Sequence, residues 1–160
     1  MGDQTAFQGY WRTYGGAWHL LRSMYFWLAL ALSVVTDRLW EPGAPAWVDL
    51  TLAIAPNLLG FALVGMAIML TFSEGKFLAA IRQKGKEDSL YMMVMASFFH
   101  FALVLSVALI LAYIGRPDWL PPFAARGLSF IGCFASLYGV LLVLATVSSI
   151  WHMARVYNNA

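Results

Sequence analysis

Four long stretches of this 160-residue sequence contain no charged side chain, and they constrain the fold more than any other feature. They cover residues 23–36, 50–73, 89–115 and 127–154. A bilayer core about 30 Å thick is crossed by roughly 20 apolar residues in a helix, so three stretches are long enough and the first falls slightly short. The sequence therefore predicts an all-α integral membrane protein with four crossings.

Composition favours one membrane domain over the whole chain. Hydrophobic residues make up 61% of the sequence, and only 10 Lys or Arg and 8 Asp or Glu carry a formal charge. A soluble domain has about a quarter of its residues charged. The net charge of +2, without a dense basic cluster, argues against nucleic acid as a partner. The single cysteine, Cys133, excludes an intrachain disulfide.

The predicted fold is a four-helix bundle formed by residues 1–160. The first helix must include Arg22, because the charge-free part alone would span only about 21 Å. The guanidinium of Arg22 would then extend toward the lipid headgroups. We expect crossings at about 17–36, 47–72, 90–113 and 128–151, with the longest connection at 73–89.

The distribution of Lys and Arg predicts the orientation. Seven of them flank the side that holds both termini, and three flank the other side. Positive residues favour the cytoplasmic side, so we expect both termini in the cytoplasm and the protein in the inner membrane. The cationic residues expected at the lipid headgroups are Arg22, Lys76, Arg82, Lys84, Lys86 and Arg155.

Small and polar residues recur on one face of the second and fourth predicted helices. Steps of three and four residues keep them on one face. In lipid, small residues promote helix association because they let two backbones approach closely. One interpretation of each face is plain packing between helices. The alternative is that one of the two faces, that of the second helix in preference, lines a water-filled axis in an oligomer. The second helix has Asp49, Ala53, Asn57, Gly60, Val64, Ala67 and Thr71, and the fourth has Ser129, Gly132, Ser136, Gly139, Val143 and Thr146.

Two polar residues at membrane depth are candidate functional groups. Asn57 follows Pro56, which frees a backbone carbonyl one turn earlier. The Asn57 amide needs a partner in hydrocarbon, so it is either a structural contact or part of a gate. His100 is interpreted either as a proton sensor or ligand site, or as a hydrogen-bond partner of a neighbouring helix.

No enzyme, metal or cofactor is expected. The sequence has no nucleophile elbow, zinc-protease motif, phosphate loop or dinucleotide fingerprint. His19 and His152 are expected at similar depth, as a pair of haem ligands would be, but no other feature supports a haem. Methionines near His100 at the start of the third crossing are typical of packing rather than of a copper site.

One segment resembles proteins of a known kind. The run from Pro56 to Phe61, followed by Phe72, Glu74, Lys76 and Phe77, resembles uncharacterised bacterial four-span proteins. In size and layout the chain also resembles small membrane components of bacterial antiphage systems. The resemblance implies a protein that oligomerises and perturbs the membrane, and it identifies no catalytic or binding residue.

The function expected from the sequence is a homo-oligomer that forms or gates a pore or channel, with antiviral defence as its setting. The partners would be the bilayer, further copies of the chain and a cytosolic protein acting as trigger. The alternative is a non-conducting anchor or regulatory subunit of a larger complex. A third hypothesis is a protein that handles lipids or small molecules through His100.

Overall fold

The computed structural model describes residues 6–41, 46–71, 81, 89–114 and 120–158. Of these residues, 94% are helical and none lies in a strand. The connection at 73–89 is described only at Ile81 and Ser89, so the predictions for Lys76, Arg82, Lys84 and Lys86 fall outside the described residues.

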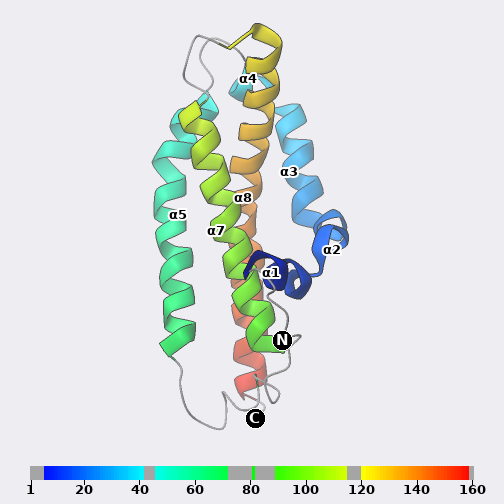
Figure 1. Ribbon diagram of the computed structural model, residues 1–160, viewed down its shortest axis with the longest axis vertical. Coiled ribbons are helices and arrows are strands. Elements are labelled where there is room, and N and C mark those ends of the chain that lie inside the picture. The colour runs from blue at the N-terminus through cyan, green and yellow to red at the C-terminus, as the bar shows by residue number, and fades with distance from the viewer. Residues whose placement is uncertain (1–5, 42–45, 72–80, 82–88, 115–119, 159–160) are drawn as a thin grey trace.

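Three helices are long and apolar enough to cross a membrane (Figure 1). They are α5 (Ala46–Thr71), α7 (Leu90–Ile114) and α8 (Pro122–Asn158). At 1.5 Å per residue, even the shortest extends over about 37 Å, more than the hydrocarbon core requires. Helix α8 begins before the expected residue 128, because Pro122 suits the first turn of a helix and the exposed Arg126 is tolerated there.

The first apolar stretch differs from the continuous helix expected at 17–36. It forms α2 (Gly16–Arg22) and α3 (Met24–Val35), which are bent by 61° at Ser23. The break leaves carbonyls at the end of α2 without helical partners; the indole N–H of Trp27 donates to the Leu21 carbonyl over 2.6 Å. Because α3 alone spans about 18 Å, a fourth crossing exists only if the bent pair counts as one span.

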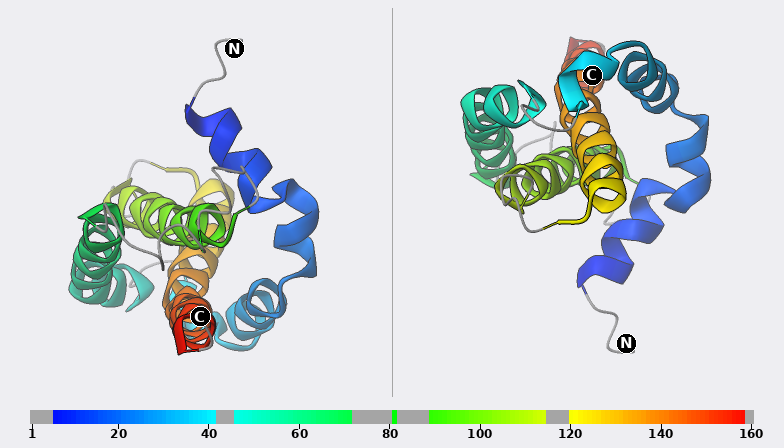
Figure 2. Two further views of the ribbon diagram at one scale, coloured as in Figure 1. Left: turned by 90° about the horizontal axis from the view of Figure 1, so that it is seen from below. Right: turned by 90° about the horizontal axis from the view of Figure 1, so that it is seen from above.

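Glycines turn the chain before α2. Gly15 and Gly16 have φ values of 93° and 67°, a conformation that side chains with a Cβ rarely adopt. The turn directs α1 (Ala6–Tyr14) across α7 (Figure 2). At the other end of α3, the short α4 (Asp37–Trp40) follows Thr36, and the indole of Trp40 donates to the Ser33 carbonyl over 2.7 Å.

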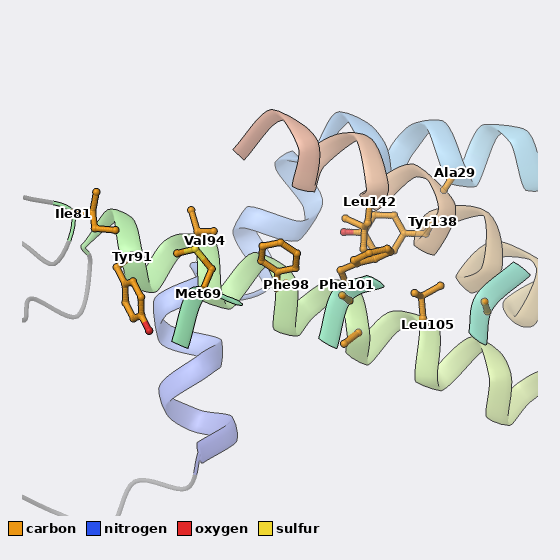
Figure 3. Packing of buried hydrophobic residues seen from close by; sticks show 13 residues of the cluster. Ala29, Met69, Ile81, Tyr91, Val94, Phe98, Phe101, Leu105, Tyr138 and Leu142 are labelled. Atoms are coloured by element: carbon orange, nitrogen blue, oxygen red, sulfur yellow. The ribbon is translucent and has the colours of Figure 1, made fainter. Parts of the chain in front are cut away.

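Helices α5, α7 and α8 pack against one another, and α3 packs along α8 (Figures 1 and 2). The arrangement is therefore a three-helix core with α3 at its side. Aromatic and aliphatic side chains of α7 and α8 fill this core, as Figure 3 shows for Phe98, Phe101, Leu105, Tyr138 and Leu142. Burying such side chains against each other excludes lipid and favours van der Waals contact.

Glycines provide the closest contacts between the long helices. A Cβ placed on Gly132 would lie 2.2 Å from a ring carbon of Trp47, which is 1% exposed. Equivalent atoms on Gly65 and Gly139 would lie 2.4 Å from Phe98 and 2.7 Å from Leu105. These separations are too short for real atoms, so each large side chain fills a space that only glycine leaves open.

The contact between Gly132 and Trp47 gives a testable prediction. Gly132→Ala should lower the free energy of unfolding by about 1–3 kcal/mol, because the ring of Trp47 is too enclosed to move away. Gly127→Ala is the matched control in the same helix, since a Cβ there meets nothing within 4 Å. Thermal unfolding in detergent measures both, and equal stability of the two variants would contradict the contact.

Candidate functional site

The small and polar face of α5 lies on the outside of the chain. Each of its seven predicted members is exposed: Asp49, Ala53, Asn57, Gly60, Val64, Ala67 and Thr71. The opposite face of α5 is the buried one, with Thr51, Ala55, Ala62 and Met69 packed toward the core. We call the seven exposed residues the α5 stripe. Within the described part of the chain, no helix covers it.

Asn57 contributes polar groups to the exposed α5 stripe. Its amide nitrogen donates to the Ala53 carbonyl over 3.3 Å, a long bond within the same helix. Pro56 lies inside α5, also on the exposed side, and lacks the N–H that would bond to the Leu52 carbonyl. An asparagine amide has two donor hydrogens and an acceptor oxygen, so this contact uses only part of its capacity.

The small face of α8 is mostly buried within the chain. Gly132 and Gly139 contact Trp47 and Leu105, as described above. Ser136 Oγ lies 2.8 Å from Thr51 Oγ1, which also lies 2.6 Å from the Trp47 carbonyl oxygen. Both contacts are satisfied when the Ser136 hydroxyl donates to Thr51 and the Thr51 hydroxyl donates to the carbonyl. The two faces that look alike in the sequence thus occupy opposite environments.

His100 lies at the centre of a hydrogen-bonded cluster of tyrosines. Its Nδ1 is 2.6 Å from the Tyr10 hydroxyl, and its Nε2 is 3.1 Å from the Tyr138 hydroxyl. Tyr14 stacks on the imidazole with ring centroids 4.1 Å apart. Because a phenol both donates and accepts, either neutral tautomer of His100 is satisfied. We call Tyr10, Tyr14, His100 and Tyr138 the tyrosine–histidine cluster.

The cluster attaches α1 to the long helices. Tyr10 and Tyr14 come from α1, His100 from α7 and Tyr138 from α8. Burial raises the pKa of the Tyr10 phenol and, to a smaller extent, that of Tyr14. Both phenols therefore stay protonated at neutral pH and can donate hydrogen bonds.

Two adjoining cavities lie between α2 and the facing parts of α7 and α8, and together we call them the terminal cavity. The first, of 580 Å³, reaches His152, and the second, of 450 Å³, reaches Arg22 and His100. Lining residues common to both are Tyr14, His19, Ser97, Ser148 and Ser149. His19 and His152 thus face one space, although the described residues contain no group of three or more His, Cys, Asp or Glu that could hold a metal ion.

Two of the six predicted headgroup cations are described, and both are exposed. Arg22 ends α2 and lines the terminal cavity, whereas Arg155 lies in the last turn of α8. Sequence reasoning singled out His100 but missed Tyr10, Tyr14 and Tyr138. The aromatic residues that precede the first apolar stretch were the available signal, because tyrosines on one face of a short helix need a surface to pack on.

Removal of the Tyr10 hydroxyl tests the tyrosine–histidine cluster. Tyr10→Phe should release α1 from α7, because it leaves a buried nitrogen of His100 without its partner, a cost of about 1–3 kcal/mol. Faster trypsin cleavage after Arg12 would report the release. Tyr113→Phe is the control, since that side chain is 81% exposed at the other end of α7. Unchanged cleavage of Tyr10→Phe would show that the hydrogen bond does not hold α1.

Comparison with known proteins identifies no relative of this chain. No protein-family model matches the chain, and neither a curated protein nor a solved structure does. Function is therefore inferred from the chain's own residues: the exposed α5 stripe, the tyrosine–histidine cluster and the terminal cavity.

Proposed function

We propose that the protein is a homo-oligomer of the bacterial inner membrane in which the α5 stripes of several copies line a pore. The exposure of the whole α5 stripe, opposite a buried face of the same helix, carries the proposal. A lipid-facing helix surface is favoured when it is apolar, whereas this surface presents an amide, a carboxyl and a hydroxyl group.

Self-association would cover the small residues and complete the hydrogen bonding of Asn57, whose only hydrogen bond among the described residues is the long one to the Ala53 carbonyl. Small residues at Ala53, Gly60 and Ala67 allow another helix to approach closely, and Asn57 would find partners in the amides of neighbouring copies. Around a symmetric axis, the polar stripe would face water rather than lipid. Asn57 and Gly60 would then lie near the narrowest part of the pore.

Four crossings with both termini in the cytoplasm complete the proposal. In this arrangement α2 and α3 together form the first crossing, and Lys and Arg concentrate on the inner side. The likeness to small membrane components of antiphage systems supports a role as an effector that permeabilises the membrane when a cytosolic partner signals. The residues at 73–89 would receive that signal.

Cysteine labelling in intact cells tests the topology. In a Cys133→Ala background, Phe7→Cys and Asn158→Cys should resist an impermeant maleimide until the cells are lysed, because both positions would face the cytoplasm. Pro121→Cys should react from outside, since it precedes α8 at the other end. Labelling of Phe7→Cys in intact cells, with Asn158→Cys protected, would mean three crossings instead of four.

Assembly and ion flux test the pore itself. Ala67→Leu and Gly60→Leu should dissociate the purified oligomer and abolish ion leakage from liposomes, because a bulky side chain separates the packed helices. Asn57→Leu should weaken the assembly by about 0.6–2 kcal/mol per contact through the loss of an interhelical hydrogen bond. Native mass spectrometry gives the subunit number and a fluorescent dye gives the flux.

Ala31→Leu is the matched control for Ala67→Leu. Both alanines are exposed on apolar helices, but Ala31 lies on α3, outside the α5 stripe. Its replacement should leave both assembly and leakage unchanged. If Ala67→Leu also behaves as wild type, the pore is excluded. A wild-type monomer that never leaks would instead favour the alternative function, a non-conducting anchor or regulatory subunit whose stripe binds a helix of another protein.

A further inference from the structure

The terminal cavity has a chemical character distinct from that of the α5 stripe. It lies on the other side of the core, against α2, α7 and α8. Its charged and titratable lining includes Arg22, His19 and His152, and none of its described lining residues is Asp or Glu. A space bordered by a guanidinium and imidazoles, with no carboxylate among its described lining residues, attracts anions.

Hydroxyl groups add further hydrogen-bonding capacity. Ser97, Ser148 and Ser149 each donate to the carbonyl four residues earlier in their own helix, over 2.8 to 3.0 Å. These carbonyls also accept the regular helical N–H, so a serine hydroxyl can rotate toward a ligand without leaving a backbone group unpaired. An oxyanion with several oxygens would use such donors.

We propose that the terminal cavity binds a phosphate group, with Arg22 as its principal charged contact and His19 and His152 as additional donors. A guanidinium matches phosphate oxygens with two parallel N–H bonds, whereas a neutral imidazole contributes a single N–H. The combined hollows of 580 and 450 Å³ have room for a phosphate together with the group that carries it. This inference does not depend on the α5 pore.

The phosphate has two possible sources, a membrane phospholipid or a phosphorylated molecule from solution. The first hollow lies near the ends of α7 and α8, where Leu90 and His152 line it, at the depth at which lipid headgroups meet a spanning helix. The second hollow extends inward from there to His100 and Leu142. Its border also includes Met24, which is 71% exposed, and the neighbouring Leu21 is 46% exposed. An acyl chain would lie against these two side chains, whereas a soluble ligand would not use them.

Thermal unfolding of the full-length protein in maltoside detergent tests the inference with three probes. Dihexanoyl phosphatidic acid offers a phosphate on short acyl chains, dihexanoylglycerol offers the same chains without phosphate, and pyrophosphate offers phosphate without chains. The phosphatidic acid should raise Tm in a saturable manner and dihexanoylglycerol should not. An additional rise with pyrophosphate would identify a soluble source, and its absence would identify a lipid.

Variants of the lining distinguish this site from general detergent effects. Arg22→Gln should raise the half-saturating concentration of the active probe by about tenfold, because it removes a charge-assisted contact. Arg126→Gln is the control: it lies near Trp40, away from the cavity, and should change that concentration by less than about twofold. His152→Gln serves as a second test if Arg22→Gln does not fold.

Two results would overturn the proposal. One is that neither phosphate probe raises Tm above the effect of dihexanoylglycerol. The other is that Arg22→Gln, or His152→Gln in its place, binds the active probe as wild type does. Loss of pore activity plays no part in either readout, so the failure of the pore and the failure of this site are separate outcomes.

Discussion

A polar group in the hydrocarbon core of a membrane must find its partner within protein, since lipid offers none. That constraint explains most of the side-chain hydrogen bonds among the described residues. At the bend at Ser23, the Trp27 indole donates to the Leu21 carbonyl, and at the end of α3 the Trp40 indole donates to the Ser33 carbonyl. Serine and threonine hydroxyls on α7 and α8 bond to their own helices. His100 is satisfied on both ring nitrogens.

On the α5 stripe this requirement is met only in part, because the Asn57 amide has one long hydrogen bond, to the Ala53 carbonyl. Polar and small residues cover one side of α5 while large apolar residues lie elsewhere on its surface, and the described chain provides no helix to cover them. A surface of this kind is stable in lipid only when another helix or water meets it. The proposed assembly with further copies would cover the small residues and give Asn57 partners, and α5 would then be the functional helix.

The short N-terminal helices form one wall of the terminal cavity. Gly15, Gly16 and Ser23 divide it into short helices that wrap around the long ones, and Tyr10 and Tyr14 attach it to His100. This wrapping creates the terminal cavity, because α2 stands away from α8 while α1 closes onto α7 (Figure 2). The terminal cavity and the α5 stripe lie on separate sides of the core, so the proposed ligand site and the proposed assembly surface do not overlap.

The amino-acid sequence alone is enough to predict a helical, membrane-spanning chain, since a charge-free length of about 20 residues has few other stable environments. It also located the small and polar faces of the second and fourth predicted helices, because helical periodicity is local. The sequence did not show which of these two faces is buried and which is exposed. Tertiary packing buries Gly132 under Trp47 and leaves Gly60 in open space. The bend at Ser23 and the contacts of His100 with Tyr10 and Tyr138 also appear only in the tertiary structure. Tyr10 is 90 positions from His100 and Tyr138 is 38 positions from it, and pairs so far apart leave no periodic pattern in the sequence.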